Sequence, residues 1–96
     1  MQQYDVHHIV AKKANSAIFG QLVLYAVEIS IESDFNKVKI NHRFHAYLNT
    51  NAYNTGVGLF LIEVYNNTTN NNHYERVKNG LLFLKVLLLA SSAIVS

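Results

Sequence analysis

The sequence contains no cysteine, no proline and no tryptophan. Without cysteine, neither disulfide bonds nor thiolate-bound zinc can stabilise the fold. The chain also lacks strong charge, because its formal net charge is only +2, far from that of a protein that binds nucleic acid by charge alone. Half of the 96 residues are apolar, which is enough to build one core, so we expect residues 1–96 to form a single domain.

Neither end of the sequence has the pattern of a targeting or membrane segment. The first residues, MQQYDVHH, have no charged stretch followed by an apolar run, so we expect no signal peptide. The C-terminal run GLLFLKVLLLASSAIVS is strongly apolar, but it is shorter than the roughly 20 residues that cross a bilayer, and Lys85 interrupts it. We therefore expect a buried or partner-facing helix there and no stable membrane insertion.

The spacing of apolar residues predicts an α+β domain in which helix dominates. The predicted strands are residues 4–10 and 37–40, the predicted helices are 14–27, 44 toward 65, and 73–90, and the predicted loops are 30–35 and 66–72. We expect the middle helix to break either near Asn51 or at Gly56 and Gly58. Four aromatic residues are expected in the core, namely Phe19, Tyr25, Phe60 and Phe83.

Two adjacent histidines, His7 and His8, lie near the end of the first predicted strand. Because neighbouring strand residues point to opposite faces, one ring could bind a metal ion while the other acts as a base on a water molecule. An imidazole, with its ordinary pKa of about 6.5, suits such a base at neutral pH. On the later helix, His45 and Asn49 are four residues apart, which places both side chains on one face, where they could grip the same cation.

Each of these signals is weak by itself. A single histidine at a strand end is more often a hydrogen-bonded structural residue, and the spacing His-x-x-x-Asn occurs by chance in many helices. The combination of a His-His pair, a second strand and a following His-x-x-x-Asn helix is more specific.

At these residues the sequence resembles the HNH/endonuclease VII nucleases, and in particular the toxin branch known as AHH. VHHIVAKKA resembles the first signature of that branch, and NKVKINHRFHAYLNTNAYN resembles the second, in which a strand leads into a helix with H-x-x-x-H/N. The resemblance covers about residues 4–55, and the Asn-rich loop and closing helix are similar in a less specific way. It implies a ββα-metal core of two short strands and a metal-binding helix, with additional packed helices.

The resemblance implies a role for each matching residue. His7, His45 and Asn49 would bind one divalent metal ion, which could be Mg²⁺, Mn²⁺, Zn²⁺ or Ni²⁺. His8 would be the general base, and Asn36 would brace it through the backbone and fix the orientation of its ring.

The sequence departs from the branch pattern at two of its signature positions. Val6 stands where the branch has alanine, and Asn49 stands where histidine is more usual. An amide oxygen is a harder and weaker ligand than imidazole, so Asn49 would favour Mg²⁺ or Mn²⁺ over Zn²⁺ or Ni²⁺, or would signal a weakened enzyme.

The activity implied by the resemblance is metal-dependent hydrolysis of phosphodiester bonds by an endonuclease with low sequence specificity, with DNA favoured over RNA. Basic side chains in the first half of the chain could position the phosphates, although an exposed lysine is the simpler explanation for each one. These candidates are Lys12, Lys13, Lys37, Lys39, Arg43 and His42. His42 could instead only cap the helix. Asn51 and Tyr53, just after the motif, could support the ligands or simply pack, and His73 is expected to be structural.

In such toxins a cognate immunity protein binds the nuclease domain, and we expect one here. Because the candidate site begins at His7, we expect the domain to be a piece of a longer secreted toxin, delivered by a secretion system to act in the target-cell cytoplasm. The apolar closing helix is a candidate contact surface, although core packing is the commoner role for its leucines, Leu81, Leu82, Leu84, Leu88 and Leu89. Two alternatives stay open: a membrane-active toxin, and a nuclease-like fold with another nucleotide- or RNA-directed activity or a binding role.

Overall fold

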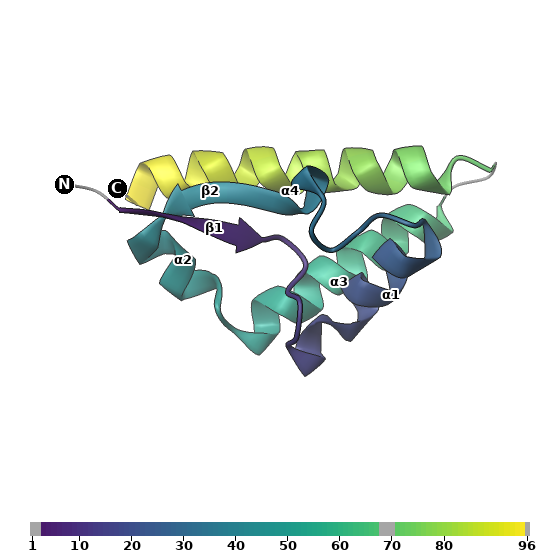
Figure 1. The fold of residues 1–96 in the computed structure, drawn as a ribbon, viewed down its shortest axis with the longest axis horizontal. Helices are drawn as coiled ribbons and strands as arrows, with labels where there is room; N and C mark the ends of the chain where they lie inside the picture. Colours follow the sequence, from purple (N-terminus) through teal and green to yellow (C-terminus); the bar gives the residue numbers. More distant parts are fainter. Residues whose placement is uncertain (1–2, 68–70, 96) are drawn as a thin grey trace.

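The computed structural model describes residues 3–67 and 71–95 and has the α+β class that the sequence predicts (Figure 1). In chain order its elements are β1 (Tyr4–His8), a 3-10 helix η1 (Asn15–Ala17), α1 (Ile18–Ala26), a 3-10 helix η2 (Asp34–Asn36), β2 (Lys37–Asn41), α2 (His42–Leu48), α3 (Asn51–Asn66) and α4 (His73–Val95). Part of the loop predicted at 66–72, residues 68–70, lies outside the described residues.

The two strands form an antiparallel hairpin whose register pairs Tyr4 with Asn41 and His8 with Lys37. Directly paired residues share a face, and alternation places Asp5 and His7 on one face of β1 and His8 on the other. The alternating apolar residues of β2 are buried in the core, as the pattern of that strand predicts. The adjacent histidines therefore point to opposite sides of the strand.

The β2–α2 junction is held by Asn41, which caps α2. Its side-chain oxygen accepts a hydrogen bond from the Phe44 backbone N–H at 2.8 Å. Its side-chain amide donates to the carbonyl oxygen of Ser92 at 3.0 Å, and its backbone N–H donates to Ser92 Oγ at 2.8 Å. The end of α4 is thereby tied to the start of the helix that was predicted to bind metal.

The long middle helix breaks between Leu48 and Asn51, close to the first of the two predicted positions. Thr50 adopts an extended backbone and its hydroxyl accepts a hydrogen bond from the Tyr53 backbone N–H, so a new helix starts there. Gly56 and Gly58, the other predicted break, lie inside α3. They do not break α3, and Gly58 is buried where a side chain would collide with α1.

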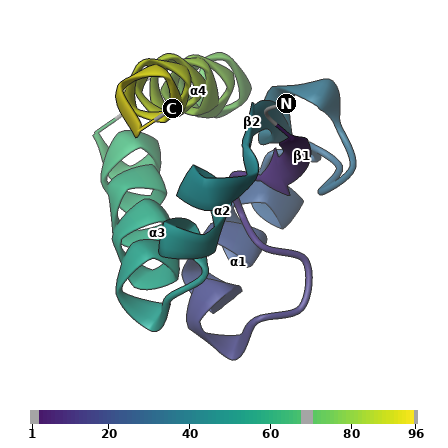
Figure 2. The ribbon, with the colours of Figure 1, turned by 90° about the vertical axis from the view of Figure 1, so that its left-hand side faces the viewer.

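The helices surround the hairpin unevenly. In Figure 1, α4 runs along the whole upper edge of the molecule and covers β2, while α1 packs against α3 below. Figure 2 shows α2 between the strands and α3. A single core fills the space between these elements, and its largest fully buried apolar side chains are Ile9, Leu24, Ile40, Leu61 and Leu81.

Three of the four aromatic residues predicted to be core are exposed. Phe60 packs partly buried against the core, but Phe19, Tyr25 and Phe83 lie on the surface. Helical periodicity fixes which residues share a face, but this small domain has too few elements to cover the outer faces of α1 and α4.

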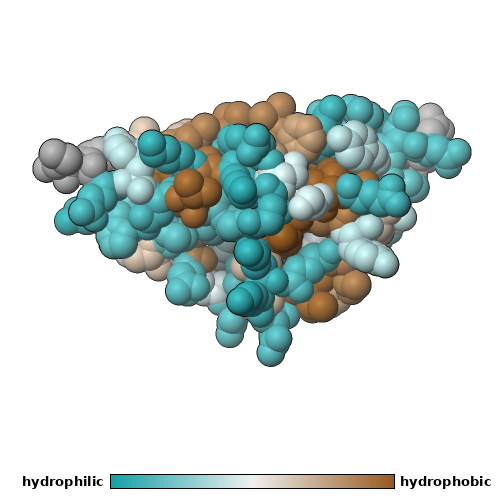
Figure 3. All heavy atoms as spheres, in the orientation of Figure 1, coloured by the Kyte–Doolittle hydropathy of each residue, from teal (hydrophilic) through white to brown (hydrophobic). Residues whose placement is uncertain are grey.

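Helix α4 is only partly covered by the rest of the fold. Within residues 3–67 and 71–95 it is the one helix long and apolar enough to cross a membrane by length and composition, and only 28% of its most apolar stretch is buried. It has 23 residues because the polar stretch 73–79 precedes the apolar run in the same helix, and the expectation of no stable membrane insertion stays a prediction. Figure 3 shows apolar side chains gathered along the upper edge, over α4.

The leucines of α4 divide between the core and the surface. Leu81 and Leu88 are buried, Leu84 is half-buried, and Leu82 and Leu89 are exposed. The expectation of core packing is therefore correct for the first two and wrong for the last two.

Candidate metal centre and base

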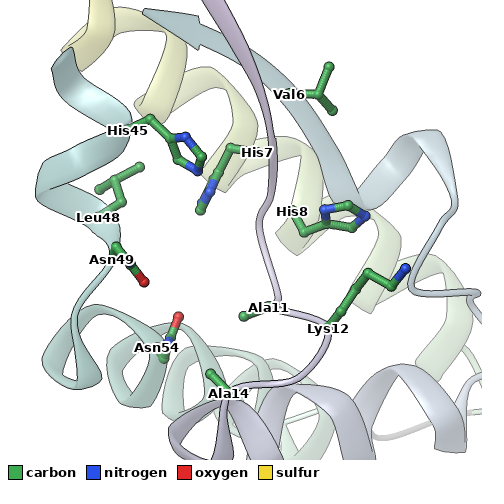
Figure 4. A pocket seen from close by; sticks show the side chains of 10 residues that line it. All are labelled: Val6, His7, His8, Ala11, Lys12, Ala14, His45, Leu48, Asn49 and Asn54. Carbon is green, nitrogen blue, oxygen red and sulfur yellow. The ribbon is translucent and has the colours of Figure 1, made fainter. Parts of the chain in front are cut away.

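A cavity of about 230 Å³ opens between the end of β1, the end of α2 and the start of α3 (Figure 4). Four of the five residues that carry the resemblance line it: His7, His8, His45 and Asn49. Asn36, in η2, is fully buried and does not line the cavity. The tertiary fold thus brings the candidate ligands and the candidate base to one place from three separate segments.

The ring of His7 is held by the hydroxyl group of Tyr53. His7 Nε2 lies 2.8 Å from the Tyr53 oxygen, which lies 3.0 Å from the carbonyl oxygen of Ile9. Because a carbonyl can only accept, the single Tyr53 proton is donated to Ile9, and His7 Nε2–H must donate to Tyr53. Nδ1 of His7 therefore keeps an unprotonated lone pair.

Burial keeps His7 neutral. Burial of the ring, together with the smaller effects of the neighbouring His45 and His8, lowers the pKa of His7 to about 4. At neutral pH His7 is therefore an unprotonated imidazole, which is the form that binds a metal ion. Burial also raises the pKa of Tyr53, so its hydroxyl keeps the proton that orients the ring.

His45, on α2, is oriented by Asp5 from β1. Its Nδ1 lies 2.8 Å from Asp5 Oδ2, and because a carboxylate accepts, Nδ1 carries the proton and Nε2 is left for a ligand. The ring centroids of His45 and His7 are 5.0 Å apart and their planes meet at 67°. In Figure 4 the two rings point toward one another across the cavity.

The Asp5 carboxylate also binds His42. Nδ1 of His42 lies 2.8 Å from the same oxygen, Oδ2, that accepts from His45. These two hydrogen bonds, with that from His45 the stronger influence, hold the pKa of Asp5 below its usual value. The suggestion that His42 caps the helix is wrong, because Asn41 fills that position.

Asn49 lines the cavity but does not lie on the helix. Helix α2 ends at Leu48, and Asn49 is the residue that follows, with φ −83° and ψ 62°. The prediction of two ligands one turn apart on one helix is therefore wrong in detail, although both side chains reach the same cavity.

Asn54, in the first turns of α3, is a cavity residue that the sequence did not suggest. It is buried, and its amide nitrogen donates to Ser16 Oγ at 3.1 Å. Figure 4 shows its oxygen pointing toward that of Asn49. The described residues contain no group of three or more His, Cys, Asp or Glu side chains that could hold a metal, so a metal here would depend on these amide oxygens beside the two imidazoles.

His8 points to the other side of the strand and binds Glu32. Its Nε2 lies 2.5 Å from Glu32 Oε1, so Nε2 carries the proton and Nδ1 is the basic atom. Lys12 Nζ lies 3.6 Å from the same carboxylate oxygen. The hydrogen bond from His8 is the main reason that the pKa of Glu32 lies below its usual value.

Asn36 clamps the chain that follows His8. Its side-chain oxygen accepts from the Val10 backbone N–H at 2.8 Å, and its amide donates to the carbonyl oxygens of Val10 and Ile31 at 3.1 and 2.9 Å. Its own carbonyl accepts from the Ile9 N–H at 2.8 Å. Asn36 thus braces the strand end through the backbone, whereas the His8 ring donates its hydrogen bond to Glu32 and makes none to the Asn36 side chain.

The basic candidates are spread over the surface. Lys12 lines the cavity beside His8. Lys39 lies over the Tyr4 ring, 5.9 Å from its centroid, on the outer face of the hairpin. The candidates that do not line the cavity are Lys13, Lys37, Lys39, Arg43 and His42.

The partners Asp5 and Glu32 were missed from the sequence for different reasons. Asp5 is two residues before His7, which in a strand is the same face, so this spacing was a usable signal. Glu32 comes from the turn after α1, and no local spacing rule links it to His8.

Comparison of the chain with protein-family models, with curated proteins and with solved structures found no match. Its function is therefore argued from the site itself.

Proposed function

We propose that the protein is an HNH-type endonuclease that hydrolyses phosphodiester bonds with one divalent metal ion. The observation that carries the proposal is the pair His7 and His45, which lie 5.0 Å apart between ring centroids and come from different elements. Each ring has one nitrogen occupied by a hydrogen-bond partner and one left with a lone pair. Histidines that bind metals characteristically donate their other N–H to such a partner.

The metal ligands in this proposal are His7, His45 and Asn49. A divalent ion bound there would stabilise negative charge on the phosphate and on the leaving oxygen. The amide oxygen of Asn49 favours Mg²⁺ or Mn²⁺ over Zn²⁺ or Ni²⁺.

His8, which points to the other face of the strand but lines the same cavity, is the proposed base. His8 Nδ1 takes a proton from the attacking water, while Glu32 accepts the Nε2–H and keeps the ring in the required tautomer. Asn36 holds the backbone after His8, so the base stays near the cavity. Lys12, beside the same cavity, is placed to contact a phosphate.

The biological setting follows from the resemblance of residues 4–55 to toxin nucleases. We propose an antibacterial toxin domain, part of a larger secreted protein, that acts on nucleic acid in the target cell, on DNA before RNA, with low sequence specificity. A cognate immunity protein would neutralise it, and the exposed apolar side of α4 is one surface available to such a partner.

The deciding experiment is plasmid nicking with Mg²⁺, Mn²⁺, Zn²⁺ or Ni²⁺ added in turn. The wild-type protein should nick the plasmid with at least one ion and stop when EDTA is added. His8→Ala should lose about 100-fold or more of the rate while keeping its fold. His73→Ala is the matched control, because His73 stacks on Tyr65 at the start of α4, outside the cavity lining. Absence of nicking with every ion, or equal rates for wild type and His8→Ala, contradicts the proposal.

A membrane-active toxin is a second candidate, favoured by the exposed apolar residues of α4. These are Leu82, Phe83, Val86, Leu87, Leu89 and Ile94. Dye release from liposomes in the absence of divalent metal would support it. Intact liposomes under those conditions would count against it.

A further inference from the structure

A second hollow, of about 420 Å³, adjoins the candidate metal centre. The two share one lining residue, Lys12, which follows the end of β1. Lys13 and Tyr25 also line the second hollow, whose floor is apolar and includes Leu24 and Ile29. A ligand that extends from the metal centre past Lys12 would enter this hollow.

Tyr25 is presented to solvent at the edge of that hollow. Tyr25 is 84% exposed, although the spacing of apolar residues along this helix predicted that it lies in the core. It lines both this hollow and a neighbouring one that contains Glu28 and Ser30. The ring thus stands between two open spaces, with the face of an aromatic system available to a flat ligand.

The segment that carries Lys12 and Lys13 is hydrogen-bonded to α1. The side-chain amide of Gln21 donates to the carbonyl oxygens of Ala11 at 2.9 Å and Lys12 at 3.2 Å. The backbone of Lys12 is therefore fixed relative to the helix that carries Tyr25. Two lysine side chains, Lys12 and Lys13, and the ring of Tyr25 therefore surround one hollow, on backbone segments that are fixed relative to each other.

We propose that this hollow binds the nucleotide next to the cleaved bond, with an unpaired base stacked on Tyr25 and its phosphates against Lys12 and Lys13. The inference rests on the proposed nuclease function. Single-strand binding sites combine a basic groove with aromatic rings in this way. Bases in a duplex stack on one another and cannot stack on Tyr25, so the protein prefers single-stranded nucleic acid.

The acidic residues around the hollow limit the path that a bound nucleic-acid strand can take. Glu32 pairs with Lys12, whose positive charge offsets that of the carboxylate beside the metal centre, and it accepts a hydrogen bond from the proposed base His8. Glu28 lies on the far side of Tyr25, in the neighbouring hollow, and would repel a phosphate there. The phosphates therefore pass on the lysine side of the ring, and the base rather than the backbone meets Tyr25.

The test is the binding of short fluorescent oligonucleotides, single-stranded and duplex, DNA and RNA, to the His8→Ala protein in EDTA. Tyr25→Ala should weaken single-strand binding between about 5-fold and 100-fold, while Tyr25→Phe, which keeps the ring, should bind within about 2-fold of the parent protein. Lys13→Gln should lower the salt dependence of single-strand binding by about 0.7 in the logarithmic slope. Tyr74→Ala, on a half-exposed tyrosine of α4, is the control and should bind as the parent does.

Since Tyr25 is exposed, its variants should keep the wild-type circular dichroism spectrum. Unchanged binding by Tyr25→Ala, or equal affinity for single strand and duplex, overturns the proposal. The two proposals fail separately. Plasmid nicking by the wild type together with normal binding by Tyr25→Ala removes this subsite and leaves the nuclease. Tyr25-dependent binding without cleavage of either plasmid or single-stranded oligonucleotide at any metal supports the subsite and removes the nuclease.

Discussion

Tyr53 fixes the tautomer of His7 across 46 residues of sequence. The Tyr53 hydroxyl donates its proton to the carbonyl of Ile9 and accepts the Nε2–H of His7. Nδ1 of His7 is thus the unprotonated atom, in a ring that burial keeps neutral. A tyrosine of α3 thereby controls which nitrogen of a strand histidine can meet a metal ion.

Tyr53→Phe should therefore weaken metal binding and stability together. It leaves a buried N–H and a buried carbonyl without their hydrogen bonds, which should lower the free energy of unfolding by about 1–3 kcal/mol. Mn²⁺ or Zn²⁺ affinity, measured by calorimetry, should fall about tenfold. Tyr65→Phe is the control, because Tyr65 stacks on His73 and does not line the cavity. Equal metal affinities for wild type and Tyr53→Phe would contradict this role.

Asp5→Asn should weaken metal binding more than it weakens folding. The neutral amide is a poorer acceptor for the His45 Nδ1–H, so the ring is less firmly oriented and less basic at Nε2. Loss of such a partner typically costs about 10- to 100-fold in metal affinity. Calorimetric titration with Mn²⁺ or Zn²⁺ checks this, with Glu75→Gln on α4 as the matched loss of one surface carboxylate. If Asp5→Asn and Glu75→Gln bind metal equally well, Asp5 does not orient His45.

Glu32→Gln should slow cleavage while leaving metal affinity unchanged. Glu32 contacts His8, the base, and does not line the metal cavity. We expect kcat to fall about tenfold or more and the metal dissociation constant to stay within about twofold. Glu32→Asp, which keeps the carboxylate, should recover part of the rate. If Glu32→Gln also lowers the metal affinity, Glu32 stabilises the metal site as well and does not act on His8 alone.

The metal-free protein should lose stability as pH falls from about 6.5 to about 4. Burial lowers the pKa of His7 from an ordinary value of about 6.5 to about 4, so the unfolded chain binds more protons across this window. The free energy of unfolding therefore rises with pH there, by up to roughly 3 kcal/mol from this group. The pKa values of Asp5 and Glu32 are also lowered, so these carboxylates stop stabilising the fold only at lower pH. They therefore change the free energy of unfolding little between pH 6.5 and 4.

Urea unfolding at several pH values, in EDTA, measures how the free energy of unfolding changes with pH. His7→Asn has no titratable ring at the position and should show a flatter profile than the wild type between the same pH values. Parallel profiles for the two proteins would show that His7 is not the group responsible.

Gly58→Ala and Gly56→Ala should change stability in opposite directions. A Cβ at Gly58 would lie 2.9 Å from Cβ of Phe19 and 3.0 Å from the backbone nitrogen of Gly20, whereas one at Gly56 would meet nothing within 4 Å. We expect Gly58→Ala to cost about 1–3 kcal/mol by forcing α1 and α3 apart. Gly56→Ala should add up to about 1 kcal/mol, because alanine is the better helix former. Thermal unfolding of both variants checks the contact, and a neutral Gly58→Ala would contradict it.

The sequence by itself predicted the two strands, the α+β class and the placement of the two histidines on opposite faces of one strand, whereas the antiparallel pairing comes from the structure. The strands were predicted at 4–10 and 37–40, and because side chains alternate along an extended chain, the prediction specified which of them share a face. The same reasoning placed His7 and His8 on opposite sides of one strand. Local spacing also predicted a helix after β2, from residue 44 through Asn49, whereas α2 spans His42–Leu48 and Asn49 follows its end.

Only the tertiary structure decided what these side chains meet. Asp5 reaches His45 from 40 residues away, Glu32 reaches His8 from 24, and Tyr53 reaches His7 from 46. Such pairs depend on how helices and strands pack, which no short-range period encodes. For the same reason Tyr25 could not be assigned to the surface from the sequence, since periodicity defines a face of α1 and only packing decides whether anything covers it.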